Sequence, residues 1–127
     1  MNFIRCRVEQ NGVGLRARLS DRISLPIPQA QTSRFQGLTG KELIFGLRPE
    51  HITEPRRSDR DQECQFDTTL DVVEPMGMET LVYFRVNGDE VCARVDPSAA
   101  AESGRPIKLT ADLSHLHLID PATDLVL

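Results

Sequence analysis

The chain has 127 residues, of which 39% are hydrophobic, and its 15 basic and 19 acidic side chains give a net charge of −4. This length fits a single domain, and a slightly acidic chain without a run of five like charges argues against nucleic acid as a partner. The three cysteines match neither a disulfide framework nor a zinc-finger spacing, and no stretch approaches the roughly 18 apolar residues of a membrane span, so we expect a soluble cytosolic domain with reduced thiols.

An Asn-Gly dipeptide at positions 11 and 12, between two alternating apolar runs, predicts a β-hairpin with a two-residue turn. In that register the numbers of paired residues sum to 23, and the buried face pairs Ile4 with Leu19, Cys6 with Ala17, and Val8 with Leu15. The opposite face pairs Arg5 with Arg18 and Arg7 with Arg16, a cluster of four arginines that would attract phosphate, an acidic protein surface or single-stranded nucleic acid. Because the chain has few aromatic residues for stacking on bases, we favour a protein contact or internal pairing with Asp and Glu.

The middle of the chain predicts short strands separated by polar segments. Alternation at residues 23–27, interrupted by proline, indicates a short edge strand, followed by a polar connector at 29–39 and a strand at 42–47. Residues 37–42 lack the spacing and the hydroxyl of a nucleotide-binding P-loop. Residues 51–65 are charged and predict a loop or a mobile insertion, and a strand from residue 66 onward ends at Pro75.

A second Asn-Gly dipeptide, at positions 87 and 88, predicts another hairpin, in which paired residues sum to 175. Its apolar face pairs Phe84 with Val91, Val82 with Ala93, and Thr80 with Val95; its other face pairs Arg85 with Glu90 and Tyr83 with Cys92. Asp96 before Pro97 indicates a helix of one or two turns at residues 96–102, and we expect strands at 107–109, 115–119 and 125–127. Some eight or nine short strands predict an all-β fold, an OB-fold-like small antiparallel barrel with at most one short helix.

Two charged motifs interrupt these strands. The first is Gly46-Leu47-Arg48-Pro49-Glu50-His51, and the second, which begins 23 residues after His51, is Glu74-Pro75-Met76-Gly77-Met78-Glu79-Thr80. Together they resemble the C-terminal transport-associated OB (TOBE) domain of the ATP-binding subunits of maltose-type sugar ABC transporters. The ending His117-Leu118-Ile119-Asp120 is similar to the family's closing segment, with Ile119 where an aromatic residue is usual.

The resemblance implies that residues 1–127 are one OB-like regulatory domain, a fragment of a longer ABC ATPase subunit whose nucleotide-binding domain is absent. It implies a regulatory and dimerisation role in an importer of carbohydrate, polyol or glycerol phosphate, with no enzymatic activity of its own. No cofactor is expected in this fragment, because ATP and Mg²⁺ belong to the absent domain. The implied partners are a second copy of the subunit, the parent ATPase domain, the membrane subunits and a regulatory protein, at the cytoplasmic side of the membrane. The alternatives are a self-contained oxyanion- or small-ligand-binding barrel, such as the molybdate-binding barrels, and an oligonucleotide-binding OB domain.

Eight residues are candidates for an interface or regulatory surface: Arg48, Glu50, His51, Glu79, Arg5, Arg7, Arg16 and Arg18. Arg48 either docks a neighbouring domain or, as we favour, pairs internally with Glu74 or Glu79. We expect no catalytic residue and no metal site. His115 and His117 would, however, lie on one side of a strand, where Cys64, Cys92 or an acidic residue could complete a zinc site.

Overall fold

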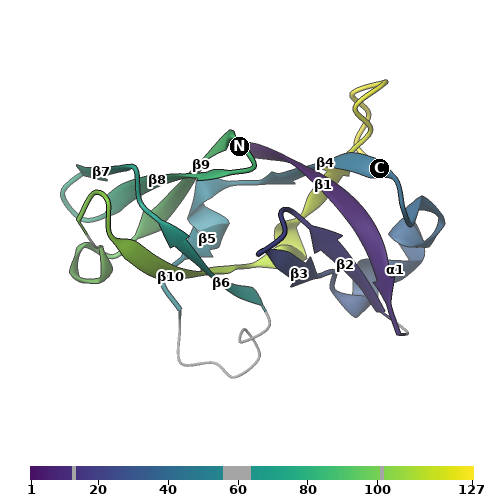
Figure 1. The fold of residues 1–127 in the computed structure, drawn as a ribbon, viewed down its shortest axis with the longest axis horizontal. Coiled ribbons are helices and arrows are strands. Elements are labelled where there is room, and N and C mark those ends of the chain that lie inside the picture. The colour runs from purple at the N-terminus through teal and green to yellow at the C-terminus, as the bar shows by residue number, and fades with distance from the viewer. Residues whose placement is uncertain (13, 56–63, 101) are drawn as a thin grey trace.

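The computed structural model describes residues 1–12, 14–55, 64–100 and 102–127, and these form three antiparallel sheets (Figure 1). The largest sheet has the order β11-β4-β1-β2-β3, formed by β1 (Asn2–Asn11), β2 (Gly14–Arg18), β3 (Ser24–Pro26), β4 (Glu42–Leu47) and β11 (His117–Ile119). The second has the order β5-β10-β6, formed by β5 (Ile52–Thr53), β6 (Gln65–Thr69) and β10 (Pro106–Ala111). The third has the order β7-β8-β9, formed by β7 (Val72–Pro75), β8 (Thr80–Val86) and β9 (Asp89–Val95). The all-β prediction is confirmed.

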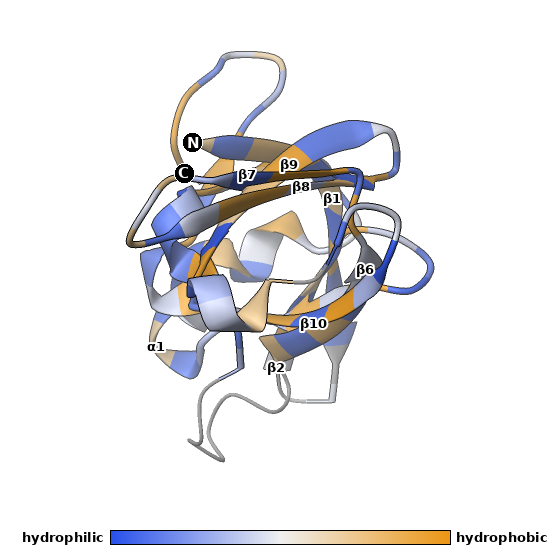
Figure 2. Ribbon diagram, turned by 90° about the vertical axis from the view of Figure 1, so that its left-hand side faces the viewer, coloured by the Kyte–Doolittle hydropathy of each residue, from blue (hydrophilic) through white to orange (hydrophobic). Residues whose placement is uncertain are grey.

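All three sheets contribute to one hydrophobic core. The fully buried side chains include Phe45, Leu47, Ile52, Phe84 and Leu109. Polar and apolar residues alternate along the strands in Figure 2, as expected when one face of each strand packs inward. Since burying each large apolar side chain contributes about 1.5–3 kcal/mol, this shared core holds the sheets together as one unit.

Side-chain hydrogen bonds also join the largest sheet to the third. The Asn2 side chain donates to the Cys92 carbonyl at 2.7 Å and accepts from the Cys92 N–H at 2.8 Å, which caps the free edge of β9. The Asn87 amide donates to the Leu19 carbonyl at 2.7 Å. The Arg5 N–H donates to the Asp89 carboxylate at 3.2 Å. These bonds supply partners for backbone groups that neither sheet satisfies by itself.

The hairpin of β8 and β9 has the predicted register. Its pairs are Thr80–Val95, Val82–Ala93, Phe84–Val91, Tyr83–Cys92 and Arg85–Glu90. Asn87 and Gly88 adopt φ values of 50° and 83°, as a type I′ turn requires. The local turn chemistry and the hydrophobic pattern agree here, so the prediction is confirmed.

The predicted register of the first hairpin is wrong by two residues. β1 and β2 pair Arg7 with Arg18, Val8 with Ala17 and Glu9 with Arg16, so that paired residues sum to 25. A shift of two residues keeps every side chain on its predicted face and changes only its neighbours. The observed register places Glu9, an acid, opposite Arg16, which lessens the like-charge repulsion of the predicted arrangement.

The polar connector predicted at 29–39 is also wrong, because it contains α1 (Gln29–Phe35) and the 3-10 helix η1 (Gln36–Leu38). Phe35 is completely buried and anchors α1 against the rest of the fold. Figure 1 shows α1 near β2, at the opposite end of the molecule from β7. Tertiary packing of one apolar anchor stabilises α1, so its sequence lacks the 3.6-residue hydrophobic period by which a longer helix is predicted.

The strand predicted from residue 66 to Pro75 is two strands in different sheets. β6 ends at Thr69, and the buried Leu70 pairs with the segment before β10 through the Leu70 N–H to Arg105 carbonyl bond of 3.0 Å. Asp71 then donates its N–H to the Tyr83 carbonyl of β8 at 2.8 Å. The chain therefore crosses between sheets at a corner that alternation in the sequence does not mark.

The remaining elements follow the sequence more closely. β3 is an edge strand and β4 has the predicted bounds. The helix predicted after Asp96 is the single 3-10 turn η4 (Pro97–Ala99), capped by the Asp96 carboxylate.

The loop predicted at 51–65 contains regular structure at its start. Its first residue, His51, ends the 3-10 turn η2 (Pro49–His51), and β5 follows directly; its residues 56–63 lie outside the described part. The predicted strand 115–119 begins only at His117, because His115 belongs to the 3-10 turn η5 (Leu113–His115), and the predicted strand 125–127 is a single bridge between Val126 and Ile119. No described helix is long and apolar enough to span a membrane.

Candidate functional site

The junction of η2 with β5 lies beside the end of β10, and the strand register explains why. β10 pairs Thr110 with Thr53 and Ala111 with Ile52, and the next position sets Asp112 beside His51. The Asp112 N–H continues the ladder by donating to the His51 carbonyl at 2.8 Å. Two residues separated by 61 positions in the chain are thus held side by side by backbone pairing.

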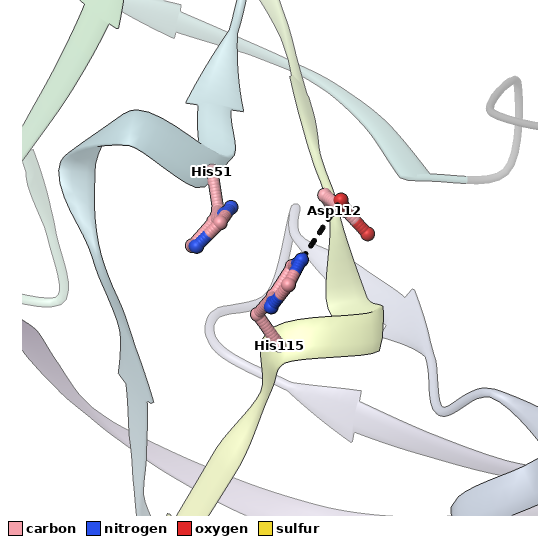
Figure 3. A group of neighbouring side chains, drawn as sticks. All are labelled: His51, Asp112 and His115. Carbon is pink, nitrogen blue, oxygen red and sulfur yellow. Dashed lines mark ion pairs between the residues drawn. The ribbon is translucent and has the colours of Figure 1, made fainter.

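The turn η5 then brings a second histidine to the same place. Asp112 caps η5, and its carboxylate accepts from the Ser114 hydroxyl at 2.6 Å and the Ser114 N–H at 3.1 Å. Within this turn His115 Nε2 lies 3.7 Å from Asp112 Oδ2. The His115 ring stacks on the His51 ring with centroids 3.9 Å apart and planes 11° from parallel (Figure 3). One carboxylate and two imidazoles therefore face one another.

The stacked histidines form part of the wall of two hollows. The first, of about 480 Å³, is lined by Gln31, Arg34, Arg48, Glu50, His51 and residues 114–117. The second, of about 340 Å³, is lined by Glu50, His51, Thr53, residues 110–112 and His115. Both walls are mainly polar, with two guanidinium groups in the first hollow and two carboxylates in the second.

Hydrogen bonds and charge set the protonation of the Asp112 carboxyl. Burial by itself raises the pKa of Asp112, but the hydrogen bonds from Ser114 and the neighbouring His115 and His51 outweigh it, so the pKa lies below its ordinary value. Asp112 is therefore an anion near neutral pH, next to two groups that are donors when protonated and metal ligands when neutral.

Helix α1, which the sequence did not predict, forms another wall of the first hollow. The Gln31 side-chain amide donates to the Ser114 carbonyl at 3.1 Å and to the Leu113 carbonyl at 3.4 Å, which ties α1 to η5. Gln31, Arg34, Thr110 and Asp112 were all missed as site residues. The sequence does contain a signal for the turn η5, because Asp112 is followed by Ser114, which it can cap, and by His115 three positions on. No such signal indicates that His51 lies beside this turn.

The structure brings together Arg48, Glu50 and His51 in the first hollow, as their adjacency in η2 requires. Glu79 lies elsewhere, where its carboxylate pairs with Arg94 at 3.1 Å. Among the described residues, Arg48 forms no ion pair with Glu74 or Glu79, so the internal pairing favoured from the sequence is wrong. Arg48 instead lines the hollow together with Arg34.

The predicted cluster of four arginines is divided by acidic and polar partners. Arg18 pairs with Glu9 at 2.7 Å, Arg5 lies 3.7 Å from Asp89, and Arg16 donates to the Ser24 hydroxyl and carbonyl at 3.0 and 2.6 Å. Arg5, Arg7 and Arg18 line a shallow hollow of about 190 Å³ that also contains Asp21 and Glu42. The sequence favoured either a protein contact or internal pairing with Asp and Glu, and the structure has such internal pairs for Arg5 and Arg18.

The solved structure of a cytoplasmic molybdate-binding protein has a similar fold. The two align with a TM-score of 0.64 over 94% of this chain and 96% of that one, at 13% sequence identity. This likeness confirms the OB-like fold class and concerns the fold alone.

Curated relatives are ATP-binding proteins of transporters. The sulfoquinovosyl glycerol transport ATP-binding protein of Agrobacterium fabrum is 36% identical over 98% of this chain and 32% of its own length. The multiple sugar-binding transport ATP-binding protein of Streptococcus mutans is 33% identical over 82% of this chain and 28% of its own. An sn-glycerol-3-phosphate import ATP-binding protein of Chromohalobacter salexigens is 34% identical over 64% and 22%. The chain thus spans about a third or less of the length of these relatives.

Two family models match the chain. Residues 1–52 match the MalK OB fold domain, and residues 45–119, which hold both charged motifs and the His51, Asp112 and His115 cluster, match the TOBE domain. The chain belongs to the TOBE domain family, and its relatives are ATP-binding proteins of sugar and glycerol-phosphate ABC transporters.

Proposed function

We propose that this domain is the regulatory and dimer-supporting part of the ATP-binding subunit of an importer for carbohydrates, polyols or glycerol phosphate. The observation that carries the proposal is the match to the sulfoquinovosyl glycerol transport ATP-binding protein, which covers 98% of this chain but only 32% of that protein. A domain that accompanies an ATPase in this way acts by binding its neighbours, at the cytoplasmic side of the membrane, while ATP and Mg²⁺ are held elsewhere in the subunit.

The fold suits a part that stays rigid while others move. Its sheets share one core and are joined by the hydrogen bonds of Asn2 and Asn87, which favours a domain that moves as one unit. If two copies remain paired while the ATPase domains separate, each closure becomes an intramolecular event with a high effective concentration. This arrangement lowers the entropic cost of every transport cycle.

The second charged motif supports a role in protein contacts. Met76 and Met78 flank Gly77 at the turn between β7 and β8, and Met78 is 96% exposed. Flexible, polarizable methionine side chains on a surface are frequent at protein interfaces. We infer that this turn, with Glu79, and the η2 turn, with Arg48, Glu50 and His51, are contact regions for the second copy and the ATPase domain. Arg5, Arg7, Arg16 and Arg18 remain candidates for an acidic regulatory partner.

A domain exchange tests the proposed function. The segment of the Agrobacterium fabrum relative that matches this chain is replaced by the chain itself, and ATP-driven uptake is measured in proteoliposomes that contain the relative's membrane subunits. We expect uptake well above that of a subunit from which the segment is deleted. A chimera whose grafted domain is folded by circular dichroism, yet whose uptake equals that of the deletion, would refute the proposal.

A further inference from the structure

We propose that His51, Asp112 and His115 bind one divalent transition-metal ion of the zinc class. The site does not depend on the proposed transport function, because it rests only on side chains of this domain. It also differs from the pairing of His115 with His117 considered from the sequence, since His115 and His117 lie in different elements.

The three side chains are close enough to share an ion. One ligand atom from each of His51, Asp112 and His115 lies within 4.8 Å of the others. Ligands about 2.1 Å from a tetrahedral Zn²⁺ lie about 3.4 Å from one another. The observed cluster therefore needs to contract by up to about 1.4 Å. The two rings, stacked with planes 11° from parallel (Figure 3), must also rotate out of the stack so that their in-plane lone pairs converge on one ion.

The backbone that carries the ligands is already fixed. The Asp112 N–H to His51 carbonyl bond of 2.8 Å locks the first two ligands together at the end of the β5–β10 ladder. The cap of η5 and the buried Leu113 hold His115 on the same side. A site built on paired strands and a capped turn loses little conformational entropy when it takes up an ion.

An unpartnered hydroxyl points independently to a ligand in the second hollow. Thr110, the register neighbour of Thr53, is only 6% exposed and lines the same hollow as His51, Asp112 and His115. Its Oγ1 has no hydrogen-bond partner among the described residues. A buried hydroxyl without a partner is unfavourable, whereas a water molecule on a bound ion would supply one.

The ligand types select the class of metal. Two imidazole nitrogens and one carboxylate oxygen match catalytic-type zinc sites, in which a fourth position is left to water, and they also suit Co²⁺, Ni²⁺ and Cu²⁺. Ca²⁺ and Mg²⁺ prefer oxygen ligands alone. We therefore expect Zn²⁺ and Co²⁺ to bind and Mg²⁺ not to compete.

Zinc titration of the whole chain by calorimetry tests the site, with His117→Ala as the matched control. His117 is an exposed histidine that lines the first hollow but lies outside the cluster. We expect one Zn²⁺ per chain, at least roughly tenfold weaker binding for His51→Ala and for His115→Ala, and less than about twofold change for His117→Ala. Asp112→Asn keeps an acceptor for the cap while removing the ligand charge, and it should also weaken binding.

The three cysteines are an alternative source of zinc ligands, and Co²⁺ distinguishes them. Binding at the proposed site gives weak visible d–d bands without the intense near-ultraviolet band of a thiolate ligand. The proposal is overturned if no stoichiometric Zn²⁺ binding occurs, if the thiolate band is present at one equivalent, or if His51→Ala and His115→Ala, both folded by circular dichroism, bind as His117→Ala does.

Discussion

Replacing Asn2 with alanine should remove the most specific link between the largest sheet and the third sheet. The Asn2 amide makes two hydrogen bonds to the backbone of Cys92, of 2.7 and 2.8 Å, and Asn2 itself is only 6% exposed. Each bond contributes about 1 kcal/mol net, and leaving the Cys92 N–H and carbonyl without partners costs about 1–2 kcal/mol more. The expected loss in the free energy of unfolding is therefore about 3–4 kcal/mol, which corresponds to roughly 10–15 °C in Tm for a domain of this size.

Urea unfolding followed by far-ultraviolet circular dichroism measures this loss. Asn2→Asp keeps the acceptor for the Cys92 N–H but sets a buried carboxylate oxygen against the Cys92 carbonyl, so it should lose at least as much stability as Asn2→Ala. Gln10→Ala is the control, because Gln10 lies on the same strand and, among the described residues, its side chain makes a single exposed hydrogen bond, to the Gly12 carbonyl. We expect the control to change stability by less than about 0.5 kcal/mol. If Asn2→Ala loses no more than Gln10→Ala, the hydrogen bonds of Asn2 do not join the sheets as described.

Three further predictions concern the turn, the missed helix and the buried thiol. Gly88→Ala should lower the free energy of unfolding by about 1–2 kcal/mol, because a residue with a side chain pays about this amount to adopt the φ of 83° that Gly88 has. Gly37→Ala is the control, since an added Cβ at Gly37 meets open space and should not lower stability. If the two variants are equally stable, the type I′ turn is contradicted. Phe35→Ala should cost about 3–5 kcal/mol in the same urea assay, and a loss below about 1 kcal/mol would mean that Phe35 does not anchor α1. Burial, and secondarily the charge of Glu42, raises the pKa of Cys6 to about 12, so its thiol should resist iodoacetamide until the chain unfolds. The thiol of Cys6 ionises above about pH 9 in the unfolded chain but only near pH 12 in the folded domain, so the free energy of unfolding should fall by about 1.4 kcal/mol per pH unit between pH 9 and 12. Cys6→Ala should remove this contribution to the pH dependence. If the slope is the same in Cys6→Ala, the buried thiol is not its source.

The two hairpins show what the sequence determines and what it does not. At Asn87 and Gly88 the turn residues and the apolar alternation specify the same register, and the structure has it. At Asn11 and Gly12 alternation fixes only which face each residue occupies, so a shift of two residues left the predicted core intact and moved every cross-strand neighbour. The observed register contains one arginine pair, Arg7 with Arg18, where the predicted register contains two.

The candidate site depended on contacts that no local pattern contains. The Arg48-Pro49-Glu50-His51 motif was recognised, but its neighbours come from α1 and η5, which the chain reaches through tertiary packing. The pairing of His51 with Asp112 follows from the short β5–β10 ladder, and two residues of β5 are too few to predict as a strand. Function was inferred from motif resemblance, which requires no knowledge of these contacts.

Sedimentation of the exchanged ATP-binding subunit without nucleotide tests the central claim most directly. If this domain holds two subunits together while their ATPase domains are apart, the Agrobacterium fabrum subunit carrying this chain should sediment as a dimer at concentrations where the subunit lacking the segment is a monomer. A nucleotide-free chimera that is folded and yet monomeric at every concentration where the deletion is monomeric would contradict the claim.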